Sequence, residues 1–117
     1  MKIEELKITQ KILDMMAAGY NYMQQYPKSV KYSLCTDIRH AMDVLLERAL
    51  EAEKKYYKKT TYRDLDIANA KLKSYLRISN QLGYLKNRPY EIWSRYLVEI
   101  GNMIGGLIKS EQNNPKQ

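Results

Sequence analysis

Proline and glycine are scarce in this chain, and their positions leave long stretches of sequence uninterrupted. Three prolines and five glycines occur among 117 residues. The residues between them are mostly good helix formers, such as Leu, Lys, Glu, Ala and Met. Helices usually stop before a proline and often end at a glycine. This pattern predicts an all-α protein, with helix ends near Pro27 and Gly83.

Apolar residues recur at helical spacing and predict four helices, the first over residues 3–26. Capping residues mark the other boundaries. We expect Ser29 to cap the second helix, Thr60 or Thr61 to open the third with Asp64 in a capping box, and Asn87 to cap the fourth. Because the links are only a few residues long, each helix must return antiparallel to its predecessor. Residues 1–110 are therefore predicted to form an up-down-up-down four-helix bundle, and residues 111–117 a flexible tail.

Each helix carries one apolar stripe that is expected to face the core. The stripes are Leu6, Leu13, Ala17 and Tyr20 on the first helix; Leu34, Ile38, Met42, Leu45, Ala49, Ala52 and Tyr56 on the second; Leu65, Ala68, Leu72, Leu76, Ser79 and Leu82 on the third; and Trp93, Tyr96, Leu97, Ile100, Met103, Ile104 and Leu107 on the fourth.

Three helices carry a further row of apolar or small residues beside the main stripe. These rows are Ile8, Ile12, Met15, Gly19, Tyr22 and Tyr26; Ile67, Lys71, Ser74 and Ile78; and Ser94, Val98, Gly101 and Gly105. They either widen the buried face or form a subunit interface. We expect a homo-oligomer, with Gly101, Gly105, Ile67 and Ile78 as candidates for helix packing or the interface.

The residue types that catalysis or metal binding needs are sparse. His40 is the only histidine and Cys35 the only cysteine, and their five-residue spacing on a helix points the side chains apart. One Cys and one His cannot build a structural zinc site. We therefore predict a protein that is not an enzyme and has no metal or cofactor. We expect Cys35 to be buried and His40 to lie at the surface or to be hydrogen-bonded. The lone cysteine, and the absence of a secretory signal or an apolar run long enough for a bilayer, predict a cytoplasmic protein without a membrane partner.

The chain is strongly basic, and the excess lies in its middle. The net charge is +7, and residues 28–87 hold 13 basic and 7 acidic residues. The segment KKYYKKTTYR at residues 54–63 has five cations, three tyrosines and no acid. Such a surface favours nucleic acid, because cations displace counterions from phosphates and tyrosine rings can stack on bases. Solubility and helix capping are the alternative explanation. The nucleic-acid candidates are Lys54, Lys55, Lys58, Lys59, Arg63, Lys73 and Arg77, and Arg39 and Arg48 could extend the surface.

Four segments, in this order, resemble the accessory variability determinant (Avd) proteins of diversity-generating retroelements. They are YPKSVKYSL at 26–34, DIANAKLKSYLRIS at 66–79, LGYL at 82–85 and EIGNMIGGLIK at 99–109, within a similarity over residues 11–110. The resemblance implies a four-helix bundle that assembles into a homopentameric barrel with a basic surface. It also implies a non-catalytic subunit that associates with the retroelement's reverse transcriptase and with structured template RNA, so that error-prone cDNA reaches a variable gene. The basic surface makes DNA a further expected ligand.

Proteins encoded in intervening sequences of large-subunit ribosomal RNA share the four-helix bundle. They typically have an Asn-x-Ala-Glu-Gly-like segment after the second helix, where this chain has KKYYKKTTYR. The difference favours the retroelement proteins. A protein-interaction scaffold of the intervening-sequence type is the alternative, in which the positive charge only keeps the protein in solution.

Overall fold

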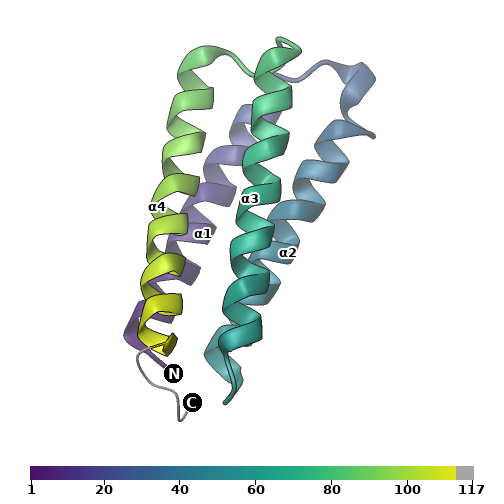
Figure 1. Ribbon diagram of the computed structural model, residues 1–117. Coiled ribbons are helices and arrows are strands. Elements are labelled where there is room, and N and C mark those ends of the chain that lie inside the picture. Colours follow the sequence, from purple (N-terminus) through teal and green to yellow (C-terminus); the bar gives the residue numbers. More distant parts are fainter. Residues whose placement is uncertain (113–117) are drawn as a thin grey trace.

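The computed structural model describes residues 1–112, which form a bundle of four antiparallel helices (Figure 1). The helices are α1 (Ile3–Met23), α2 (Leu34–Lys54), α3 (Lys59–Gln81) and α4 (Asn87–Gln112), with a short 3-10 helix, η1 (Lys28–Val30), between α1 and α2. Each helix packs against the one before it, and α4 also packs against α1. The prediction of an all-α, up-down-up-down four-helix bundle is confirmed. The α2–α3 link lies at the same end of the bundle as the N-terminus and the end of α4 (Figure 1).

The helix boundaries differ from the expected ones by a few residues. α1 ends at Met23, and the single turn of η1 delays the start of α2 to Leu34, rather than directly after Ser29. α2 ends at Lys54, so Tyr56 lies in the link after it and is 74% exposed instead of belonging to the core. α4 continues to Gln112, so the helix includes the first two residues of the expected tail. Residues 113–117 of that tail lie outside the described residues.

At α3, the predicted capping residue is wrong and the predicted terminating glycine is confirmed. α3 already begins at Lys59, so Thr61 lies inside the helix, where it is buried instead of serving as the cap. Gly83 ends the helix as predicted, with a φ of +82° that glycine adopts without strain. Leu82 beside it is 54% exposed and does not join the core.

Trp93 of α4 is fully buried and lies against α1. Its Nε1–H group donates a hydrogen bond to Sδ of Met15 at 3.2 Å. The indole ring packs on Gly19, where an added Cβ would lie 2.6 Å from Cζ2 of the ring. The other buried residues include most of the predicted core of three helices, namely Ile38, Met42, Leu45, Ala49 and Ala52 of α2, Leu65, Ala68, Leu72, Leu76 and Ser79 of α3, and Leu97, Ile100, Ile104 and Leu107 of α4.

α1 turns a different face to the core from the one that its main apolar stripe predicts. Leu6, Leu13 and Tyr20 are 44%, 43% and 45% exposed. Both rows of α1 repeat at helical spacing, so periodicity does not distinguish them. The core selects the row with Gly19, because a position without a side chain leaves room for the indole of Trp93. The buried row is Ile8, Ile12, Met15, Gly19 and Met23.

Candidate nucleic-acid interface

Four of the predicted cationic residues gather around the link between α2 and α3. Lys54 is the last residue of α2, Lys55 lies in the link, and Lys59 and Arg63 occupy the first turns of α3. All four side chains are exposed. We call these four residues the basic cluster. Glu51 of α2 forms ion pairs with Lys55 of this cluster at 3.7 Å and with Arg48 at 2.8 Å.

Lys58 stands in the same run of sequence but has a different role. It is 8% exposed, and its ammonium donates hydrogen bonds to both carboxylate oxygens of Glu5, each at 2.9 Å. Glu5 also accepts hydrogen bonds from the backbone N–H of Lys2 at 2.7 Å and from the hydroxyl of Tyr62 at 2.7 Å. The ammonium is thus committed inside the bundle, and Lys58 is a structural residue instead of a phosphate contact.

Burial and hydrogen bonding around Glu5 shift the pKa values of Glu5 and Tyr62 in opposite directions. Burial by itself would raise the pKa of Glu5, but the hydrogen bonds from Lys2, Lys58 and Tyr62 outweigh it and hold the pKa below its usual value of 4.5. Burial raises the pKa of the Tyr62 hydroxyl, and its hydrogen bond to Glu5 raises it further. At neutral pH the Glu5 carboxylate is therefore ionised and the Tyr62 phenol is neutral. This arrangement ties the start of α3 to the first turn of α1.

The remaining cationic candidates lie farther along α3. Lys73 and Arg77 share a side of the helix with Lys59, because separations of 14 and 18 residues are close to whole turns. At 1.5 Å per residue they lie about 21 Å and 27 Å from Lys59 along the helix. Both are exposed. The structure therefore divides the predicted surface into the basic cluster at one end and two further cations along α3.

The two arginines of α2 do not extend this surface freely. Arg39 donates hydrogen bonds to the carbonyl oxygen of Lys31 at 3.0 Å and to the hydroxyl of Thr36 at 3.3 Å. Arg48 is held by its ion pair with Glu51. Both guanidinium groups are thus engaged with oxygen atoms of the same chain.

Sequence reasoning missed two buried carboxylates. Glu5 is 2% exposed, and its spacing of three residues from Ile8 is the signal that would have placed it on the buried row. Glu111 is 6% exposed, and it continues the core row of Ile104 and Leu107 by one turn. Neither of its carboxylate oxygens has a hydrogen-bond partner among the described residues, and Nζ of Lys2 lies 3.9 Å from Oε2.

The candidate packing residues fall into two groups. Gly101 faces α3 of the same chain, where an added Cβ would lie 3.2 Å from Nδ2 of Asn69 and 3.6 Å from Nζ of Lys73. That close approach lets Asn69 donate a hydrogen bond to the carbonyl oxygen of Leu97 at 2.9 Å. Gly105 has open space around it, and Ile67 and Ile78 are 67% and 40% exposed. Gly101 thus serves packing between α3 and α4, while the other three are left on the surface.

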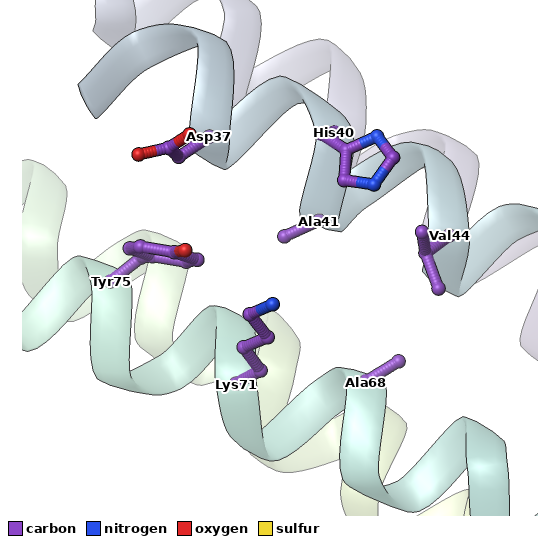
Figure 2. A pocket seen from close by; sticks show the side chains of 7 residues that line it. All are labelled: Asp37, His40, Ala41, Val44, Ala68, Lys71 and Tyr75. Atoms are coloured by element: carbon purple, nitrogen blue, oxygen red, sulfur yellow. The ribbon is translucent and has the colours of Figure 1, made fainter. Parts of the chain in front are cut away.

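A shallow groove of about 170 Å³ runs between α2 and α3 (Figure 2). Asp37 and His40 line it from α2, and Tyr75 and Lys71 line it from α3, with the lysine extending into the space between the helices (Figure 2). His40 is exposed and Cys35 is fully buried, as predicted. Burial raises the pKa of the Cys35 thiol, which makes it a poor nucleophile.

Within residues 1–112, no group of three or more His, Cys, Asp and Glu side chains is placed to hold a metal ion. Among the same residues, no helix has both the length and the apolar character that a membrane crossing requires.

Comparison with known proteins places the chain in one family. A search of curated proteins and a search of solved structures found no match. A family model described as bAvd-like matches residues 6–111, which is nearly the whole chain and includes all four helices. The resemblance to the Avd proteins is thereby confirmed, and the chain belongs to the bAvd-like family.

Proposed function

We propose that this chain is the non-catalytic accessory subunit of a diversity-generating retroelement, and that it binds nucleic acid through the basic cluster. Membership of the bAvd-like family indicates an accessory role in such an element. The arrangement of exposed cations at the α2–α3 link supports the nucleic-acid binding. Lys54, Lys55, Lys59 and Arg63 are exposed around a link that the buried Lys58 ties to the bundle.

Cations held close together on a fixed backbone suit a phosphate backbone. Each contact releases counterions from the nucleic acid, and the ordered link lowers the conformational entropy that binding must overcome. Lysine and arginine contacts of this kind position a nucleic acid without reading its bases. The expected ligand is the structured template RNA, with DNA as a second polyanion that the same contacts would bind, and Lys73 and Arg77 extend the contact along α3. The expected protein partner is the reverse transcriptase of the element.

Exposed apolar rows on opposite sides of the bundle support assembly into a closed ring. Leu6, Leu13 and Tyr20 repeat every seven residues on α1, where each is more than 40% exposed. Ile67 and Ile78 are exposed on α3, which packs on α2 and α4. Two different surfaces on opposite sides of a protomer are what a head-to-tail ring requires. A homopentamer, as the family resemblance implies, would use one such junction five times.

The nucleic-acid part of the proposal is tested by a salt series with two matched charge variants. Lys54→Gln/Lys55→Gln/Lys59→Gln removes three cations of the basic cluster. Lys28→Gln/Lys86→Gln/Arg88→Gln removes three exposed cations at the other end of the bundle and serves as the control. Lys58 is left intact, because its replacement would break a buried ion pair.

The measurement is the affinity for a structured RNA over a range of salt concentrations, with the oligomeric mass checked in parallel. Each lost phosphate contact lowers the slope of log affinity against log salt by about 0.7 to 0.9. The cluster variant should therefore lose roughly 2 to 3 units of slope, and the control variant should keep the slope of the wild type. Equal effects of the two variants would mean that only net charge matters. Unchanged binding by the cluster variant would remove the basic cluster from the proposal.

A protein-interaction scaffold is the second candidate, and the exposed apolar rows on α1 and α3 favour it. It predicts tight binding of a protein partner with little salt dependence, and no binding of RNA. Co-purification of the reverse transcriptase with the wild-type chain and with the cluster variant distinguishes the two roles. If both retain the enzyme while neither binds RNA, the scaffold role is the better description.

A further inference from the structure

The α2–α3 link is fixed at both of its ends. On the α2 side, the backbone N–H of Lys55 donates to the carbonyl oxygen of Glu51 at 2.9 Å. On the α3 side, the carbonyl oxygen of Lys58 accepts from the backbone N–H of Tyr62 at 2.9 Å, while the Lys58 ammonium is held by Glu5. Tyr56 and Tyr57 lie between these anchors, so the backbone that carries them has little freedom to fold their rings against the core.

The side chains of Tyr56 and Tyr57 are exposed to solvent. Tyr56 is 74% exposed and Tyr57 is 75% exposed. Their rings meet edge to face, with centroids 5.0 Å apart and an interplanar angle of 86°. In this geometry each ring leaves at least one face uncovered by the other. By contrast, Tyr62 and Trp93 are fully buried, so the core has its own aromatic side chains and does not use this pair.

The charges around the pair favour a polyanion as the ligand. Lys54, Lys55 and Lys59 flank the two rings in the sequence, and residues 54–63 contain no acid. Tyrosine is also common in protein–protein interfaces, but a protein surface that matched this site would have to be strongly acidic. A nucleic acid supplies regularly spaced negative charges together with flat aromatic bases.

Stacking further selects the state of the nucleic acid. A base inside a duplex is already covered on both faces by its neighbours, so a protein side chain can stack on it only by unstacking the duplex, which costs free energy. Unpaired bases in loops, bulges and single strands can be covered by an aromatic ring. We propose that Tyr56 and Tyr57 stack on unpaired bases of a single-stranded segment whose phosphates contact the basic cluster. This inference rests on the proposed nucleic-acid binding and adds a preference for unpaired nucleotides to it.

The test compares two RNA probes and three tyrosine variants. The probes are a labelled oligouridylate and a fully paired RNA duplex of the same length. Tyr56→Leu/Tyr57→Leu removes both rings, and Tyr56→Phe/Tyr57→Phe keeps the rings and removes the hydroxyls. Tyr32→Leu is the control, because Tyr32 is 94% exposed in the α1–α2 link at the other end of the bundle. Circular dichroism and thermal unfolding check that each variant is folded.

We expect the leucine pair to bind the oligouridylate about tenfold more weakly or worse, and to bind the duplex as the wild type does. The phenylalanine pair and Tyr32→Leu should bind both probes normally, and the salt dependence should not change, because no phosphate contact is removed.

Several results would overturn the proposal. One is that the leucine pair loses affinity equally for both probes, and another is that it loses affinity for neither. A third is that the phenylalanine pair also loses affinity, which would assign the effect to the hydroxyls. A leucine pair that binds RNA normally but no longer retains the reverse transcriptase would make the link a protein-binding surface instead. If the wild type binds neither probe, the proposed function fails and this inference fails with it. If the wild type binds both probes and the leucine pair loses nothing, only the stacking fails.

Discussion

Lys58 places its ammonium 2.9 Å from both carboxylate oxygens of Glu5, a residue 53 positions earlier in the chain. The pair joins the start of α3 to the first turn of α1. It also divides the lysine-rich segment into two kinds of residue, because Lys58 holds the link in place while Lys54, Lys55 and Lys59 remain exposed. A buried cation in the middle of the segment therefore fixes the geometry in which the exposed cations are presented.

The buried pair should show strong energetic coupling. Glu5→Gln leaves the Lys58 ammonium buried without a negative partner, and Lys58→Met leaves the Glu5 carboxylate without its cation. Each single change should lower the free energy of unfolding by about 3 kcal/mol. The double variant should lose clearly less than the sum of the two, since neither charge is then left unpaired. Urea unfolding of the wild type, the two single variants and the double variant measures this coupling as a double-mutant cycle. Additive losses would mean that the two residues do not stabilise the fold through each other.

The same pair makes the stability dependent on acid. The pKa of Glu5 is lowered in the folded state, so the unfolded chain binds a proton more readily at this site. The stabilisation is present at pH values above about 4.5 and is lost as the pH falls through the folded-state pKa. Urea unfolding of the wild type and of Glu5→Gln should therefore differ strongly at neutral pH, and the difference should shrink in acid. A difference that stays constant with pH would assign the effect of the substitution to packing.

Two glycines should respond in opposite ways to the same substitution. Gly19→Ala would place a Cβ 2.6 Å from the indole ring of Trp93 and 3.1 Å from Sδ of Met42. The overpacking should cost about 1 to 3 kcal/mol and exceed the gain in helix propensity. Gly105→Ala meets open space and should raise the free energy of unfolding by up to about 1 kcal/mol.

Urea unfolding at low protein concentration compares these two variants. If Gly19→Ala were as stable as the wild type, Trp93 would have to shift easily, which the packing in the core argues against. A Gly105→Ala variant that folds well but assembles less than the wild type would place Gly105 in the subunit interface.

The buried carboxylate of Glu111 should lower the free energy of unfolding. Its carboxylate lacks a hydrogen-bond partner among the described residues, and the Lys2 ammonium lies 3.9 Å away. Burying a charge without close partners is unfavourable. Glu111→Gln should therefore raise the free energy of unfolding by about 1 kcal/mol, as measured by urea unfolding at neutral pH. A loss of stability in this variant would show that the negative charge at this end of the bundle is needed, with Lys2 as the partner.

A head-to-tail ring predicts a specific result when two interface variants are mixed. Leu13→Glu and Ile67→Glu each place a charge on one of the two exposed apolar rows. Each variant alone should be monomeric, because every junction in its ring would contain the charged residue. An equal mixture should form dimers and nothing larger, since one intact row from each variant can still pair. Light scattering gives the masses. Dimers of a single variant would instead indicate a twofold interface that uses one row only.

The sequence alone predicted most of the fold because the relevant signals are local. Helical periodicity and the glycine at the end of α3 are properties of neighbouring residues, and they identified four helices and the core stripes of α2, α3 and α4. The concentration of cations in residues 54–63 is likewise visible in the sequence, as are the segments that resemble the Avd family. Antiparallel packing followed from the short links between the helices.

The tertiary structure decided the questions that depend on a distant partner. Two rows of α1 have the same period, and the volume of the Trp93 ring determined that the row with Gly19 is buried. Lys58 is indistinguishable from its neighbours in sequence, and a carboxylate on another helix made it structural. Gly101 and Gly105 share one row, yet only the first faces α3. Periodicity states which residues share a face of a helix, whereas the shape and charge of the facing helix decide what each of those residues does.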